Sequence, residues 1–460
     1  MGIEKAEEGN KKRSVAARPR GLPLIGYLPF IGADLHISFT KLAKVYGPIY
    51  KLRLGTKLCV VLSSPDLIKE VVRDHDVTFA NRDPTVAASV FSNGGTDNAF
   101  APYGSNWRML LKILARQMLS HANLDASYAL RRHEVRKAIR VVCGKIGKPI
   151  DVGKVTFSTV VNATGSMVWG GMLDGEKGSD QSGGFRAVVS ELMVLLAKPN
   201  VSDFFPVLAR LDIQGVERKT KKVTRWIERI FYFKVDQRMK MDMDEGEGSG
   251  KGEGKDFLQF LLQLKEQEAT GTSITLAQIK ALLADIMSGG IDTTASTAEW
   301  VMAEIIRHPR VMMKVHEELT NVVGENNNVE EFHIPKLVYL RAILKGALRL
   351  YPVAPLLIPR CPNKSCTVGG YTIPEGTRIL VNVWAMHRDP NVWDSPLEFR
   401  PERFLTHTTK LDYMGNVYEY LPFGSGRRIC PGIALAQSLG GEAADVYVGY
   451  FIAFFRMEIA

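Results

Sequence analysis

A single cysteine near the carboxyl end of the chain has the surroundings that most clearly indicate chemistry. Cys430 lies in the stretch LPFGSGRRICPG, behind two arginines and ahead of a proline. A thiolate is a strong metal ligand, but a buried thiolate stays ionised only when positive charge and hydrogen-bond donors surround it. Arg428 supplies a cation. Three glycines allow the backbone to fold close around the sulfur and to direct N–H groups at it: Gly424, Gly426 and Gly432.

The spacing of this stretch is too specific to be accidental. The pattern Phe-x-x-Gly-x-Arg-x-Cys-x-Gly is met from Phe423 to Gly432, and at average residue frequencies its chance probability in a chain of this length is on the order of 10⁻⁴ or less. It resembles the cysteine-ligand loop of the cytochrome P-450 superfamily, the haem-thiolate monooxygenases. The resemblance implies that Cys430 is the axial ligand to the iron of haem b (iron protoporphyrin IX), with cofactor contacts from Phe423, Gly424, Arg428 and Gly432.

Other segments extend this resemblance across most of the chain. GGIDTT, residues 289–294, resembles the family's oxygen-binding segment, where glycines leave room for O2 and a local helix distortion opens. Asp292 and Thr293 are then the acid and the alcohol that relay protons. FRPERF, residues 399–404, resembles the meander motif, in which Arg403 braces the fold. PRGLPLIGYLPF resembles the hinge that follows a membrane anchor, and SDFFPVLARLDIQG is similar to plant members that oxidise terpenoids or phenolics.

The resemblance also implies partners for the haem propionates and a substrate pocket. Two propionates need cations, for which Arg428 and Arg360 are candidates, with Trp107 stacking or donating from its helix. Substrate contacts in this family come from the loop at residues 85–105, from the long helix and from the segment after LRLYP. The residues apolar enough to line a dry pocket for a small hydrophobic substrate are Val90, Phe91, Ala99, Phe100, Ile286 and Leu356.

The spacing of apolar residues predicts that most of the elements that position these residues are helices. Helical spacing of apolar residues runs from about residue 65 to 234, with loops at 79–105 and 199–215. The longest helical signal begins at Thr275, whose capping box Gln278 completes, and it ends at His308-Pro309. Further helices are predicted over residues 309–323 and 335–351.

Short β-like runs predict a small sheet that uses both ends of the chain. Residues 47–55 and 57–64 read as a hairpin about Gly55-Thr56, and further strands lie within residues 365–385. The fold class is therefore α+β, mostly α with a small sheet, as in the cytochrome P-450 fold with its long central helix. We predict one monooxygenase domain over residues 31–460, behind a basic, proline-rich tail and non-helical hinge at 1–30. The glycine-rich, charged stretch 244–256 reads as a flexible surface loop.

Composition and net charge limit the kinds of partner and compartment that suit this chain. The 460 residues are 45% hydrophobic and 23% charged, an ordinary globular balance. Five scattered cysteines, without a C-x-x-C pair, favour a reduced, cytosol-facing compartment. The net charge of +10 favours acidic partners or anionic lipid, and no arginine-rich, aromatic-interleaved segment indicates nucleic acid. No run of about 20 apolar residues encodes a transmembrane anchor. The resemblance implies localisation at the cytosolic face of the endoplasmic reticulum membrane, and without an anchor we expect the chain to be peripheral or soluble.

Three departures from the family pattern predict weakened haem binding and activity. Gly346 stands where the family's Glu-x-x-Arg has its glutamate, which leaves Arg349 and Arg403 without a shared carboxylate; loss of one partner of a buried ion pair costs about 3–5 kcal/mol. Leu111 stands where Trp-x-x-x-Arg has its arginine, which leaves Arg108 and Lys112 as the nearest substitutes for the propionate, although neither lies on that helix face. The short segment after Cys430 lacks the family's terminal hairpin, so the chain looks trimmed at both ends.

Three functional hypotheses follow. In the first, the chain is an active monooxygenase: electrons come from an NADPH-cytochrome P-450 reductase docked on the basic residues Arg427, Lys112 and Arg108, and one oxygen atom of O2 enters a small hydrophobic substrate of the terpenoid or phenolic class. In the second it is a catalytically impaired haem-binding or haem-free relic of the same fold. In the third it binds lipid surfaces through its basic tail.

Overall fold

Helices dominate the part of the chain that the computed structural model describes, which is residues 18–171, 181–244, 256–266, 274–324, 327–405 and 411–433. The predicted loop at 244–256 and the segment after Cys430 fall largely outside these residues. The helices are α1 Leu35–Tyr46, α2 Pro65–Lys69, α3 Val86–Phe91, α4 Ser105–Ile113, α5 His121–Ala126, α6 Tyr128–Cys143, α7 Val152–Trp169, α8 Gln181–Ala197, α9 Val201–Phe204, α10 Val216–Asp244, α11 Phe257–Glu266, α12 Leu276–Arg307, α13 Pro309–Val323, α14 Val338–Leu350 and α15 Val383–Met386.

A small sheet joins the two ends of the chain, as the sequence predicts. Strands β1 (Ile49–Leu54) and β2 (Lys57–Leu62) form the antiparallel hairpin, and β5 (Arg378–Val381) pairs with β2 in parallel. Gly55 turns the hairpin at a φ of +59°, and a Cβ there would lie 2.6 Å from the carbonyl oxygen of Phe204. Two further short strands, β3 (Cys366–Val368) and β4 (Tyr371–Ile373), form a separate antiparallel pair. The predicted α+β class, mostly α, is confirmed.

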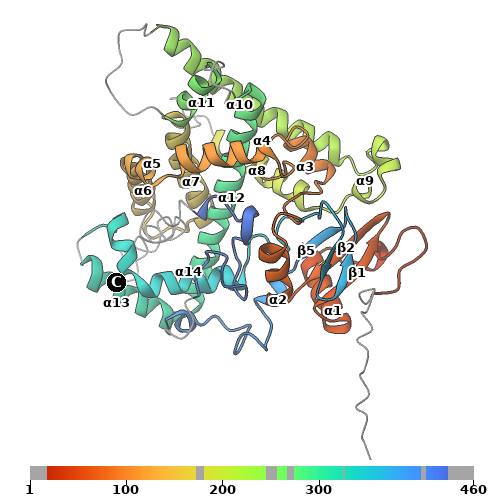
Figure 1. Cartoon of the computed structure of the whole chain (residues 1–460). Helices are drawn as coiled ribbons and strands as arrows, with labels where there is room; N and C mark the ends of the chain where they lie inside the picture. The colour runs from red at the N-terminus through yellow and green to blue at the C-terminus, as the bar shows by residue number, and fades with distance from the viewer. Residues whose placement is uncertain are drawn as a thin grey trace, which may run out of the picture.

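The long helix α12 runs through the middle of the molecule, with the three-stranded sheet, α1 and α2 to one side (Figure 1). Its predicted capping box is present, because Thr275 Oγ1 accepts from Gln278 N at 3.2 Å and Gln278 Oε1 accepts from Thr275 N at 2.8 Å. The 32 residues of α12 end before Pro309, which makes it about 48 Å long. One continuous hydrophobic core includes residues of α7, α8, α12 and α14.

Two predictions of local structure are wrong in detail. The hinge forms a short 3₁₀ helix at Leu28–Phe30 and docks on the sheet, where Tyr27 N donates to Arg53 O at 2.7 Å. These backbone contacts, which no local pattern reveals, fix residues that the sequence treats as a linker. The helix expected at 335–351 begins only at Val338, because Pro335 lies inside a preceding 3₁₀ turn, Glu331–Lys336.

Candidate active site

The loop around Cys430 is folded tightly by its glycines. Cys430 N donates to Phe423 O at 3.0 Å, which closes the loop on itself. Gly424 and Gly426 both have positive φ, +73° and +68°, and a Cβ at Gly426 would collide with the carbonyl oxygen of Val72. Side chains at these positions would be strained or excluded. The loop conformation therefore depends on the glycines that the motif contains.

The sulfur of Cys430 lies against backbone N–H groups of its own loop. The residue has an intermediate exposed fraction. Burial raises the pKa of the Cys430 thiol, whereas the N–H groups of Gly432 and Ile433 act to lower it. Burial prevails, so this thiol needs a bound cation to become a thiolate ligand.

The middle of α12 is open where the glycines lie. Gly289 and Gly290 are exposed, although Ser288 and Ile291 on either side of them are buried, and no atom beyond their own helix lies within 4 Å of a Cβ built on either glycine. The expected helix distortion is not found, because α12 is helical throughout. The open surface at this point of α12 comes from the missing glycine side chains instead.

The two predicted proton-relay residues lie on this open segment. Thr293 Oγ1 donates to Gly289 O at 2.6 Å, which fixes the hydroxyl on the glycine turn. Burial raises the pKa of the Asp292 carboxyl, and the charge of Arg186 on α8 opposes that shift. Asp292 therefore holds its proton to higher pH than an exposed aspartate does.

Two predicted propionate partners, Arg428 and Trp107, form one stacked unit. The Arg428 guanidinium lies 4.4 Å from the centre of the Trp107 ring. Arg428 Nη1 donates to Asn98 O at 3.2 Å, and Trp107 Nε1 donates to the same oxygen at 3.1 Å. The indole N–H is thus engaged by the backbone, and Trp107 acts through stacking.

The third predicted partner, Arg360, is buried rather than solvated. It is 3% exposed, and its Nη2 donates to Ser425 O at 2.6 Å, which ties it to the cysteine loop. Its Nη1 is buried and has no hydrogen-bond partner among the described residues. Burial lowers the pKa of Arg360 to about 10. An anion beside Arg360 would satisfy this orphaned donor.

A further arginine, Arg82, lies close to the predicted propionate partners. The expected substitutes for the arginine missing at Leu111, Arg108 and Lys112, are both exposed. Arg82 approaches from the loop before α3, with Nη1 donating to Ile358 O at 2.7 Å. Burial, and then the charges of Arg360 and Arg428, lowers the pKa of Arg82 well below its usual range. Arg82 stands two positions after the apolar pair Phe79-Ala80, and no motif in the sequence identified it as a cofactor partner.

These three arginines fit the two acidic groups of haem. Their like charges repel one another in a buried place, so a bound anion is needed to stabilise them. Within the described ranges no group of three or more His, Cys, Asp or Glu residues could hold a metal ion. A metal bound at Cys430 therefore needs its other donors from a prosthetic group, as an iron porphyrin provides.

Arg349 and the meander arginine, Arg403, both bind backbone carbonyl oxygens. Arg349 donates to three carbonyl oxygens, those of His387 at 2.7 Å, Pro396 at 2.6 Å and Glu398 at 3.0 Å. Arg403 also donates to Glu398 O, at 3.2 Å. Backbone carbonyls thus accept from the Nη atoms of Arg349, and the Nε atom has no partner among the described residues. Burial, then the charges of Arg403 and Arg388, lowers the pKa of Arg349 to about 9.

Restoring the glutamate by Gly346→Glu is expected to raise the free energy of unfolding by about 1 kcal/mol. Arg349 Nε is buried and finds no partner in the part of the chain that the structure describes, and the new carboxylate would lie one helical turn before it. The Phe399 ring, 3.0 Å from a Cβ at this position, must shift by a few tenths of an ångström. Chemical denaturation followed by circular dichroism measures the change. Gly346→Gln is the uncharged control, and an equal gain for Gln would contradict the charge argument.

The predicted pocket residues are divided between two parts of the core. Phe91 and Ile286 lie in the large cluster around α12, and Phe100 packs against it. Val90 and Ala99 are half-buried. Leu356 packs instead against the cluster formed by the sheet and α1, so the structure does not bring it to the other five.

Comparisons with known proteins agree with this geometry. The family model described as cytochrome P-450 matches residues 17–439. The chain is 38% identical to a flavonoid 3'-monooxygenase of Petunia hybrida over 96% of its length and 85% of that protein's length. It is 34% identical to ferruginol synthase of Isodon rubescens, covering 93% and 86% of the two chains. A solved zebra fish cytochrome P-450 structure with progesterone superposes with a TM-score of 0.73 at 26% identity, covering 92% and 91%.

Proposed function

The chain belongs to the cytochrome P-450 family and is a haem-thiolate monooxygenase, and we propose that its substrate is a small phenolic or terpenoid molecule. When bound, haem supplies the activation of O2 with electrons from a reductase. The observation that carries the proposal is the Cys430 sulfur, toward which a tightly folded glycine loop directs the N–H groups of Gly432 and Ile433. We assign this domain to residues 31–460, behind the tail and hinge at 1–30.

The residues of the site divide into those that hold the cofactor and those that handle protons. Cys430 would ligate the iron from the loop that contains Phe423, Gly424 and Gly432. The buried arginines would bind the propionates, with Trp107 supporting one of them by stacking. Asp292 would hold the proton that Thr293 passes on beside Gly289. Phe91, Phe100 and Ile286 supply an apolar wall that excludes water from the substrate.

Asp292→Asn and Thr293→Ala are each expected to lower substrate turnover by about 100-fold, because an acid and an alcohol are then lost from proton delivery. The carbon monoxide spectrum should stay unchanged, since neither residue contacts the sulfur side of the cofactor. Thr294→Ala is the matched control, because Thr294 makes the same type of bond, to Gly290 O at 2.7 Å. Equal losses in all three variants would contradict a specific relay.

A basic surface supports docking of an NADPH-cytochrome P-450 reductase. The guanidinium groups of Arg108 and Arg427 lie 5.5 and 5.7 Å from the centre of the same ring, Tyr103. Lys112, one turn after Arg108, is also exposed. Arg427 belongs to the cysteine loop, so a partner with an acidic face bound here would lie next to the cofactor. Such docking weakens as salt concentration rises.

An apolar surface supports contact with the cytosolic face of the endoplasmic reticulum membrane. Leu24 is 89% exposed and Val207 is 90% exposed. The segments that carry them lie together, because Ile25 O accepts from Gly55 N at 3.1 Å and Thr56 N donates to Phe204 O at 2.9 Å. Large exposed apolar side chains gathered on one surface are typical of membrane-contact sites.

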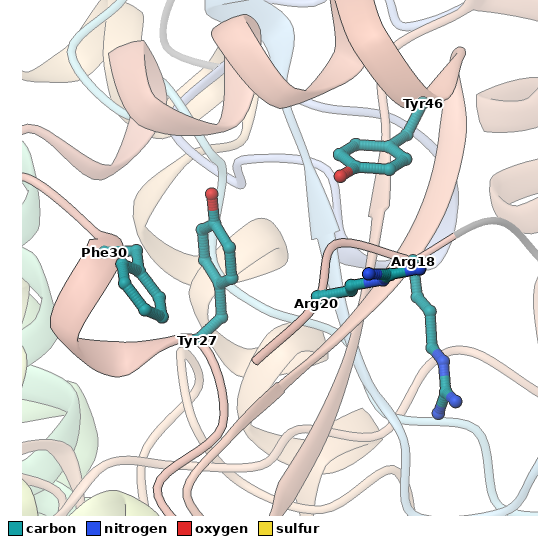
Figure 2. Close-up of a pocket in the computed structure, with 5 residues that line it drawn as sticks. All are labelled: Arg18, Arg20, Tyr27, Phe30 and Tyr46. Carbon is teal, nitrogen blue, oxygen red and sulfur yellow. The ribbon is translucent and has the colours of Figure 1, made fainter. Parts of the chain in front are cut away.

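A basic pocket lies beside this apolar surface. The pocket has a volume of about 430 Å³. It is lined by two arginines and three aromatic residues: Arg18, Arg20, Tyr27, Phe30 and Tyr46 (Figure 2). Cations next to apolar side chains suit an anionic headgroup at the membrane surface. No described helix combines the length and apolar composition that crossing a bilayer requires.

The test is the carbon monoxide spectrum of the reduced, haem-loaded protein, followed by product analysis with phenolic and terpenoid substrates. A red-shifted Soret band together with an oxygenated product supports the proposal. An unshifted band, or no haem bound, would instead indicate the impaired relic of the same fold.

A further inference from the structure

Two aspartates, one buried and one partly buried, meet between α12 and the loop before α4, and neither takes part in the function proposed above. Asp97 is 1% exposed, and its Oδ1 accepts from Phe100 N at 2.9 Å. Asp285, on α12, accepts at 2.6 Å from the N–H of Asn98, the residue that directly follows Asp97. This bond brings the two carboxyl groups to the same turn of the loop. Asp97 Oδ2 is buried and receives no donor from the described residues. A proton on Asp285 is the donor that would satisfy it.

The Asn98 peptide group, which hydrogen-bonds to Asp285, also hydrogen-bonds to the predicted propionate partners Arg428 and Trp107. Asn98 gives its N–H to Asp285, while its carbonyl oxygen accepts from both Arg428 and Trp107. Ala101 O accepts from Arg428 Nη2 at 2.5 Å, and Ala99 O accepts from Arg82 Nε at 3.2 Å. The loop therefore presents amides to the acids and carbonyls to the arginines.

We propose that Asp97 and Asp285 share one proton and act as positioning residues, which fix the Asn98 peptide and thereby hold Arg428 and Trp107 in place for the haem propionate. This inference rests on the proposed haem site. If both carboxyls were ionised, two negative charges would meet in a buried place, and the loop would have to move away from α12. The pair therefore couples proton binding to the geometry of the propionate partners.

The surroundings favour retention of the shared proton at neutral pH. Burial raises the pKa of Asp97 to about 6. Burial, and then the negative charge of Asp97, raises the pKa of Asp285 well above its usual value. Among the described residues, the charged groups that act on the pair from neighbouring elements are Arg82 and Arg428, which face Asp97. Because the pKa of Asp285 is raised, the pair retains the shared proton to higher pH than an exposed aspartate would, and loses it as the pH rises further.

The test compares haem loss at about pH 7 and about pH 10 in three forms of the full chain, with transfer to apomyoglobin as the measurement. In the natural protein the rate should rise at least about tenfold, the effect of one lost buried hydrogen bond. Asp285→Asn keeps the acceptor for Asn98 N and replaces the shared proton with an amide N–H, so its rate should vary much less with pH. Asp285→Leu should lose haem rapidly at both pH values.

A matched control is Asp203→Asn. Asp203 is also buried and also accepts a backbone N–H, from Val86 at 2.6 Å, and burial raises the pKa of Asp203 too. The rate of haem loss from Asp203→Asn should change with pH as it does in the natural protein. If the rate of haem loss from Asp285→Asn changed with pH as much as it does in the natural protein, the proposal would be overturned.

Infrared spectroscopy gives a second readout that does not require haem. At neutral pH the protein should show a protonated buried carboxyl band that Asp285→Asn removes and Asp203→Asn leaves in place. Absence of that band in the natural protein would also overturn the proposal. If the natural protein bound no haem while this band was present, the proposed function would fail and the carboxyl pair would stand.

Discussion

Replacing Cys430 with alanine is expected to abolish the red-shifted carbon monoxide band and to lower substrate oxidation by at least about a thousandfold, equivalent to roughly 4 kcal/mol of activation barrier. The methyl group cannot ligate iron, and the N–H groups of Gly432 and Ile433 lose the sulfur they face. Haem content should also fall, because the propionate arginines alone then hold the cofactor. Absorption spectroscopy of purified protein and product analysis measure both effects.

Cys361→Ala is the matched control. Burial also raises the pKa of the half-buried Cys361, but its sulfur lies against Pro362 O rather than against backbone N–H groups. This variant should keep the natural spectrum and activity. A Cys430→Ala protein that retained the red-shifted band would refute Cys430 as the ligand.

Replacing Arg131 with methionine is expected to lower the free energy of unfolding by about 3–5 kcal/mol, because it leaves Glu331 charged and buried. Arg131 is fully buried and forms a bidentate pair with Glu331, at 3.0 and 2.9 Å. This pair joins α6 to the turn that precedes α14. Burial raises the pKa of Glu331 against the opposing effect of Arg131. Without the arginine, Glu331 takes up a proton more easily, so the loss should be smaller at about pH 5 than at pH 7.

Urea denaturation at both pH values measures this effect. The double variant Arg131→Met with Glu331→Gln should be more stable than Arg131→Met alone, because the buried charge is gone. Arg136→Met is the control, since Arg136 pairs with Glu330 at 2.8 Å from a position that is 42% exposed and should cost at most about 1 kcal/mol. Equal losses for Arg131→Met and Arg136→Met would contradict the role of burial.

Features that depend on neighbours in sequence were predictable. The limits of α12 follow from the Thr275 capping box and from Pro309, both of which act within one turn of the helix end. The cysteine loop follows from glycines spaced around Cys430, because close backbone approach requires them locally. The hairpin about Gly55 and the α+β class could be read from the period of apolar residues for the same reason.

Features that depend on contacts between distant segments were decided by the tertiary structure alone. Arg82 reaches Ile358 O across 276 positions, and Asp285 reaches Asn98 N across 187. No motif formed by neighbouring residues in the sequence identifies Arg82 or Asp285 as part of the site. The carbonyls that accept from Arg349 were likewise not predictable, because they belong to residues 38 to 49 positions away. The sequence by itself determined the iron-binding loop and the class of chemistry. Burial, which sets both charge balance and pKa, arises only when remote segments pack together, so the folded chain decided which groups surround the cofactor.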